Sequence, residues 1–130
     1  MIVRCPIFQA APGVIVLEQR PRWEAALKRN LSDSAIRIRG CRKSKDALEL
    51  LEQMRDSVLV IDLSTGTEEA LRLTETVSRR SLTAGIVVIA SDADTELEWA
   101  FRELGAHAFL PDSLRGEALF QVCSNFGQKP

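Results

Sequence analysis

Two acidic side chains and one amide stand directly after apolar stretches of strand length. Asp62 ends the stretch 58–61, and Glu18 and Gln19 follow the stretch 14–17. Because the carboxyl ends of parallel strands meet at one edge of a sheet, we expect these side chains to converge there. Carboxylates gathered at such an edge could hold Mg²⁺ while one of them receives a phosphoryl group. The alternative is that the three residues only cap loops and neighbouring helices, since strand ends are polar in most α/β proteins.

The strands that would position these residues are visible as apolar runs. The run 57–61 is rich in β-branched residues, which is typical of a central strand buried on both faces. Further strands are expected at 14–17, 36–39, 86–90 and 106–110. Apolar residues at helical spacing lie between them, so strand and helix alternate with short links. This pattern predicts an α/β fold, a three-layer α/β/α doubly wound five-stranded parallel sheet of the flavodoxin-like kind, with strand order 2-1-3-4-5.

Three of the expected helices carry capping signals at their N-termini. Ser44 is predicted to be an N-cap, because its hydroxyl can accept a hydrogen bond from the first turn. Thr65 and Glu68 have capping-box spacing, and so do Thr95 and Glu98. We therefore expect helices that begin just after residues 44, 65 and 95.

Length and composition indicate one ordinary domain. With 130 residues, of which 45% are hydrophobic, the chain can bury one core and is too short for two. Residues 13–126 are assigned to this domain, 1–12 to an N-terminal extension and 127–130 to a tail. The 17 basic and 18 acidic residues give a net charge of −1, so the chain lacks the basic surface that nucleic-acid binding requires. We expect no nucleic-acid partner.

The cysteines and the N-terminal segment indicate a soluble cytoplasmic protein. Cys5, Cys41 and Cys123 are odd in number, widely spaced and without a CxxC motif, so we expect reduced thiols. Residues 1–13 contain an arginine and two prolines where a signal peptide needs a continuous apolar core. No apolar run approaches the roughly 18 residues of a membrane span, so we expect no membrane partner.

Several common chemistries are excluded by the residue types of the loops. Residues 18–22 contain no glycine, so neither a Walker A loop nor a dinucleotide-binding loop follows the first strand. His107 is the single histidine, and no serine or cysteine has the setting of a catalytic nucleophile, so we expect a packed or surface residue. Trp99 is turned roughly 200° from Leu97 around its helix and should point outward. It is either a partner contact or a cover over neighbouring aliphatic side chains.

Four stretches share their order and spacing with one known family. Residues 14–21 resemble an opening strand with its acidic pair, 46–51 a second-helix signature, and 58–62 a strand that ends in a phosphoacceptor aspartate. Residues 104–110 are similar to the segment before the last loop, with Phe109 at an aromatic switch position. Through these stretches nearly the whole chain resembles the receiver domains of bacterial two-component response regulators.

The resemblance implies a phosphoacceptor and a metal site. Asp62 would accept the phosphoryl group, and Glu18 and Asp62 would ligate Mg²⁺. Gln19 stands where the family places the second acid, which is expected to ligate the metal directly. An amide oxygen brings no charge to the cation, so the resemblance implies weak Mg²⁺ binding and no cofactor beyond it.

The phosphate-binding positions also depart from the family pattern. Ala90 occupies the position of the hydroxyl residue after the fourth strand, and Ser91 could replace it only if the loop shifts by one residue. Asp112 occupies the position of the lysine that pairs with the phosphoryl oxygens. We therefore expect a pocket without a cation. Losing such electrostatic help typically adds several kcal/mol to the barrier of phosphoryl transfer.

We interpret the chain as a degenerate receiver, or pseudo-receiver, of two-component phosphorelay signalling. It would be no enzyme and would act by protein contact, with a histidine kinase, an output domain or another signalling protein as partner. Homodimerisation is left open. The contact face is expected on the fourth helix, fifth strand and fifth helix, with Trp99, Arg102 and Phe109.

Two alternatives stay open. The first is a functional receiver that uses Glu18, Asp62 and Ser91, with Asp62 phosphorylated in the presence of Mg²⁺. The second belongs to another class, a flavodoxin-like domain that binds a small molecule at the carboxyl edge of the sheet.

Overall fold

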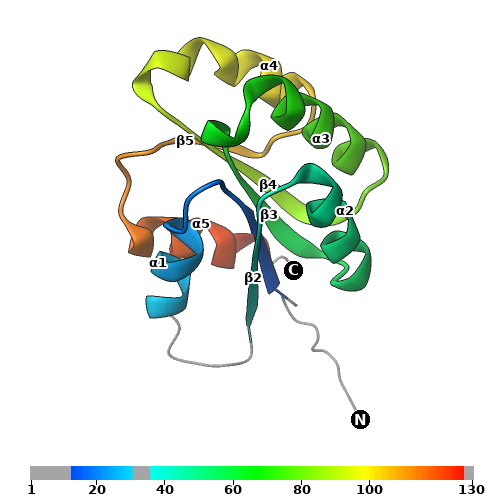
Figure 1. Cartoon of the computed structure of the whole chain (residues 1–130), viewed down its shortest axis with the longest axis vertical. Coiled ribbons are helices and arrows are strands. Elements are labelled where there is room, and N and C mark those ends of the chain that lie inside the picture. Colours follow the sequence, from blue (N-terminus) through cyan, green and yellow to red (C-terminus); the bar gives the residue numbers. More distant parts are fainter. Residues whose placement is uncertain (1–12, 31–35, 128–130) are drawn as a thin grey trace.

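Strand and helix alternate along the residues that the computed structural model describes, 13–30 and 36–127 (Figure 1). The strands are β1 (Gly13–Leu17), β2 (Arg37–Cys41), β3 (Ser57–Asp62), β4 (Thr83–Ala90) and β5 (Ala108–Pro111). The α-helices are α1 (Trp23–Arg29), α2 (Ser44–Gln53), α3 (Thr67–Arg79), α4 (Glu98–Glu103) and α5 (Gly116–Gly127). Two short 3₁₀ helices, η2 (Leu63–Thr65) and η3 (Asp92–Leu97), precede α3 and α4.

The predicted segments at the two ends of the chain are only partly covered. The extension 1–12 and residues 128–130 lie outside the described residues. Helix α5 continues to Gly127, one residue past the domain end predicted from the sequence. Within the described part of the chain, no helix is both long and apolar enough to cross a membrane.

All five strands are parallel and lie in the order β2-β1-β3-β4-β5, which confirms the predicted fold class and strand order. Strands β1 and β3 are neighbours, and Leu17 pairs with Ile61. Glu18 and Asp62 therefore leave the sheet next to each other. Ala90 at the end of β4 pairs with Pro111 at the end of β5, so the loop after β5 begins at the same edge.

Alternate residues of the strands contribute to two apolar cores, one on each face of the sheet. Ile15 and Ile61 belong to the core under α2, α3 and α4, whereas Val16 and Val60 belong to the core under α1 and α5. The two groups of helices lie on opposite sides of the sheet (Figure 1). This double coverage is the reason why β3 is apolar along almost its whole length.

The three predicted helix starts are displaced in the structure. Helix α2 begins at Ser44 itself rather than after it. The Thr65 hydroxyl donates to the carbonyl three residues earlier at 2.9 Å, and Thr95 does the same at 3.3 Å. Helix α3 then begins after Gly66, which has a φ of 124°. The capping predictions are wrong because both threonines close the preceding 3₁₀ turn instead of capping the next helix.

Candidate functional site

Glu18 is buried and accepts backbone hydrogen bonds from the start of α1. Its Oε1 accepts from the N–H groups of Arg22 at 3.2 Å and Trp23 at 2.9 Å, and its Oε2 accepts from the N–H of Glu24 at 3.1 Å. Only 5% of the residue is exposed. Both carboxylate oxygens therefore face N–H donors, which is the capping arrangement that the sequence left open as an alternative.

Asp62 ends β3, and both oxygens of its carboxylate also accept hydrogen bonds. Oδ1 accepts from the backbone N–H of Ser64 at 2.9 Å and so caps η2. Oδ2 accepts from the indole N–H of Trp23 at 2.8 Å. Trp23 is only 1% exposed, and a buried indole N–H needs an acceptor. The indole and the carboxylate therefore satisfy each other across the carboxyl edge of the sheet.

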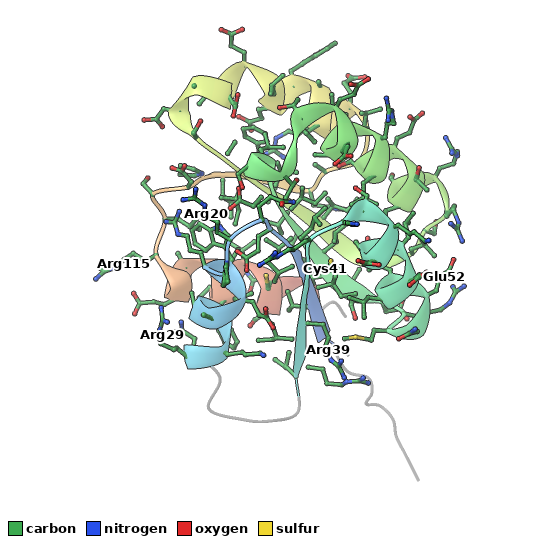
Figure 2. The ribbon with its side chains drawn as sticks, viewed as in Figure 1. Arg20, Arg29, Arg39, Cys41, Glu52 and Arg115 are labelled. Carbon is green, nitrogen blue, oxygen red and sulfur yellow. The ribbon has the colours of Figure 1, made fainter. Side chains whose placement is uncertain are left out.

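Asp62 borders an open groove of about 590 Å³. Its lining residues are Gln19, Arg20, Arg22, Asp62, Ser64 and Asp112. The expectation of a pocket without a cation is wrong, because two arginines of the loop after β1 line it together with the two acids. Figure 2 labels Arg20 on this loop. Since all lining residues are polar or charged, the groove is not the apolar pocket that would favour a flavodoxin-like ligand site.

Arg22 connects the two sides of this groove. Its guanidinium carbon lies 4.0 Å from the centroid of the Trp23 ring, a cation–π contact. Its Nη2 donates to the backbone carbonyl of Asp112, in the loop after β5. The Asp112 N–H in turn donates to the Ala90 carbonyl at 2.9 Å. The loop after β5 is thus held at Asp112 by the end of β4 and by Arg22, the residue just before α1.

The residues at this edge do not fit a bound Mg²⁺. The ion requires several oxygen ligands in nearly octahedral geometry, but the oxygens of Glu18 and Asp62 are directed at N–H groups. Gln19 donates its side-chain amide to the Arg42 carbonyl at 2.9 Å. In the described ranges, no group of three or more His, Cys, Asp or Glu side chains could hold a metal ion.

Comparisons with known proteins place this architecture among solved folds. No family model and no curated protein matches the sequence. The receiver domain of the response regulator TorR is 18% identical, with a TM-score of 0.76 over 88% of this chain and 94% of that one. A response regulator from Thermotoga maritima is 18% identical, with a TM-score of 0.77 over 92% and 99% of the two chains. The chain has the receiver fold. At these identities the likeness concerns the fold alone.

At the position that the resemblance assigns to a hydroxyl residue, the chain has the methyl group of Ala90. Ala90, the last residue of β4, is buried at 3% exposed. Ser91 follows it, and its hydroxyl donates to the Asp94 carboxylate at 3.4 Å, within η3. The hydroxyl of Ser91 is therefore engaged with its own loop.

The residues predicted for the contact face of the receiver fold differ in exposure. Trp99 is 72% exposed on α4, as its helical position predicted. Arg102 pairs with Glu98 at 2.8 Å on the same helix. Phe109 on β5 is partly buried, with its ring centroid 5.9 Å from that of Phe101. Trp99 is thus the exposed large apolar side chain among these three residues, while Phe109 packs against the core.

His107 and the thiols have structural surroundings. His107 lies just before β5, and its Nδ1 accepts a hydrogen bond from the backbone N–H of Ile86 in β4 at 3.0 Å. Cys41 ends β2, and its Sγ donates to the Val16 carbonyl at 3.6 Å. Burial raises the pKa of Cys41 to about 12, with Asp46 and two glutamates adding to the effect. Burial raises the pKa of Cys123 to about 12 as well. Neither thiol is an activated nucleophile.

Sequence reasoning missed Trp23 and Arg22 as site residues. The helical spacing assigned Trp23 to the core. This is correct for its ring, but the spacing does not predict a partner for its indole N–H. One signal was available. A tryptophan directed into a core next to an acidic strand end needs an acceptor for its N–H, and Asp62 is such an acceptor.

Proposed function

We propose that the chain is a receiver-like module of two-component signal transduction that acts by protein contact, with a degenerate phosphorylation site at Asp62. The likeness to receiver domains of response regulators supports the signalling class. The observation that carries the degenerate assignment is the engagement of the acidic pair. Each of the four carboxylate oxygens of Glu18 and Asp62 accepts at least one hydrogen bond from an N–H group.

The chemistry of phosphoryl transfer explains why this arrangement would be slow. The transition state spreads negative charge over the phosphoryl oxygens, and catalysis depends on cations and donors positioned around it. Here both Asp62 oxygens already accept from N–H donors, Ala90 offers no hydroxyl, and Asp112 adds a negative charge to the groove. Without such stabilisation the barrier rises by several kcal/mol.

The contact face of the proposed module consists of α4, β5 and α5. Trp99 supports this choice, because it is the exposed large apolar side chain of the described residues. Arg102 lies one helical turn from it and Phe109 lies on the adjacent strand. The partner class would be a histidine kinase, an output domain or another signalling protein of the cytoplasm, and a second copy of the chain is a further option.

The test is phosphorylation in vitro. The purified chain is incubated with Mg²⁺ and acetyl phosphate, and separately with beryllofluoride, and intact-mass spectrometry and NMR measure occupancy of Asp62. We expect little modification, and Asp62→Asn provides the background. A variant that carries Gln19→Asp and Asp112→Lys restores the family's acid and lysine and should take up more phosphoryl group. Stoichiometric modification of Asp62 in the unaltered chain would overturn the degenerate assignment.

A functional phosphoacceptor is the second candidate, and one observation favours it. Arg20 and Arg22 line the groove beside Asp62, so positive charge is present near the acceptor although it does not come from the lysine position. If this candidate is correct, the same assay gives a phosphorylated chain. Arg22→Ala should then lower the rate of modification more than an arginine-to-alanine change on a helix surface, such as Arg79→Ala.

A further inference from the structure

Trp23 joins the two acidic residues at the carboxyl edge of the sheet. Its backbone N–H donates to Glu18 Oε1 at 2.9 Å, and its indole N–H donates to Asp62 Oδ2 at 2.8 Å. The residue is 1% exposed, so neither donor has water as a substitute partner. A single neutral residue thus connects the two carboxylates through two N–H donors.

The Trp23 ring also supports the Arg22 guanidinium, which reaches the loop after β5. Arg22 stacks on the ring at 4.0 Å and donates to the Asp112 carbonyl. The same residue, Asp112, is fixed through its N–H to Ala90 at 2.9 Å. The first turn of α5 lies just beyond, and α1 and α5 pack on the same face of the sheet. Asp112, the first residue of the β5–α5 loop (residues 112–115), is therefore bound to the end of β4 through its N–H and to Arg22, which stacks on Trp23, through its carbonyl.

We propose that Asp62 is the anchor of a fixed link that runs through Trp23 and Arg22 to Asp112 and presets the β5–α5 loop without metal or phosphoryl group. The inference rests on the proposed function in one respect, since it takes the adjoining α4–β5–α5 face as the contact face. Trp23 and Arg22 are positioning residues in this link. Losing the acceptor at residue 62 leaves a buried indole N–H unsatisfied, so the ring shifts and the platform under Arg22 is lost.

The link is tested by hydrogen exchange of the two hydrogen-bonded amides of this loop, those of Asp112 and Leu114, which donate to the Ala90 and Pro111 carbonyls. In Asp62→Ala, Trp23→Phe and Arg22→Ala we expect these amides to exchange about tenfold faster, which corresponds to roughly 1.4 kcal/mol of local opening free energy. Asp62→Asn keeps an acceptor oxygen and should show a smaller increase. Arg22→Lys keeps the charge but loses the planar stacking group, so it should resemble Arg22→Ala more than the parent chain.

Two matched controls separate the link from general effects. Arg20→Ala removes the other arginine of the same groove, and Trp99→Phe changes the other tryptophan at an exposed site, so both should leave loop exchange unchanged. Amides of β3 report global unfolding in every variant. Loop exchange that stays unchanged in Asp62→Ala and Arg22→Ala, or that rises only in proportion to β3, would overturn the link.

Failure of the link and failure of the proposed function are distinguishable. The exchange experiment uses neither metal nor phosphodonor and reads the resting chain. A chain that accepts a phosphoryl group on Asp62 but still shows loop coupling to Trp23 and Arg22 would overturn the degenerate assignment and leave the link in place. A chain that resists phosphorylation and shows no coupling would do the reverse.

Discussion

Glu18 offers the sharpest distinction between an acidic pair that stabilises the fold and one that binds a cation. We expect Glu18→Ala to destabilise the protein in the presence of EDTA, because three backbone N–H groups at the start of α1 lose their acceptor. A carboxylate that served chiefly as a metal ligand would behave differently. Without metal it would repel Asp62, so its removal would leave stability unchanged or raise it.

The size of the effect follows from the burial of the three donors. The bond from the Trp23 N–H is buried, so losing its charged acceptor costs about 1.5–3 kcal/mol. The N–H groups of Arg22 and Glu24 are partly buried and can regain water, so each adds about 0.5 kcal/mol. The sum is about 3 kcal/mol, which lowers the Tm of a chain of this length by about 10 °C. Glu18→Gln keeps one acceptor oxygen and should lose about half as much.

Urea and thermal unfolding followed by circular dichroism measure these losses, in EDTA and again with excess Mg²⁺. The control is Glu68→Ala in the first turn of α3, whose side chain is 81% exposed, and it should change stability by less than about 0.5 kcal/mol. The capping role of Glu18 would be refuted if Glu18→Ala were as stable as the parent in EDTA and weaker only when Mg²⁺ is added.

Four further predictions concern the tryptophans, two glycines and two thiols. Trp23→Phe should cost about 2 kcal/mol in urea unfolding through the lost bond to Asp62, whereas Trp99→Phe, at a site 72% exposed, should cost less than about 0.5 kcal/mol. Gly105→Ala should lower the Tm more than Gly66→Ala. Both have positive φ, at a strain of about 1–3 kcal/mol, but a Cβ at Gly105 collides with Ser78, whereas one at Gly66 makes an ordinary contact with Glu69 Oε1 at 3.8 Å. In a Cys5→Ser background, Ellman's reagent at pH 8 should label Cys41 and Cys123 slowly until urea is added, since their pKa values are raised to about 12. Because burial raises the pKa values of both thiols, their protonated forms contribute fully to the free energy of unfolding below the unfolded pKa of about 9. This contribution is lost as the pH rises from there toward 12, and urea unfolding at alkaline pH checks it.

The fold could be predicted because burial on both faces leaves a strong pattern. The apolar run that became β3 required a central strand, and alternation of strand and helix required parallel crossovers. Element ends were less predictable because small local bonds decide them. Strand β5 begins at Ala108 rather than at residue 106, and the ring nitrogen of His107 takes the N–H of Ile86 just before it. The His107 side chain thus takes the place of a backbone acceptor for the Ile86 N–H, and the alternation of apolar and polar residues cannot predict such a bond.

The site could be predicted as far as topology determines it. Strand order predicted that Glu18, Gln19 and Asp62 converge at one edge, and Gln19 and Asp62 do line the same groove. The positions of Arg20 and Arg22 could not be predicted in this way, since they depend on how the loop after β1 turns when Glu18 collects the N–H groups that follow it. The cations of the groove therefore come from loop geometry, whereas the family resemblance predicts a cation only at residue 112.

An acid at residue 62 has a physical reason that does not involve phosphorylation. A leucine there would leave the buried Trp23 indole without an acceptor, at a cost of about 1–3 kcal/mol, and would also remove the cap of η2. An asparagine would keep an oxygen for one of the two donors. Gln19 and Ala90 have no such ties to the indole, so exchanging them would not disturb the Trp23 contact. The aspartate can thus be retained by packing alone while its catalytic surroundings change, and its presence at the end of β3 is no measure of phosphoacceptor activity.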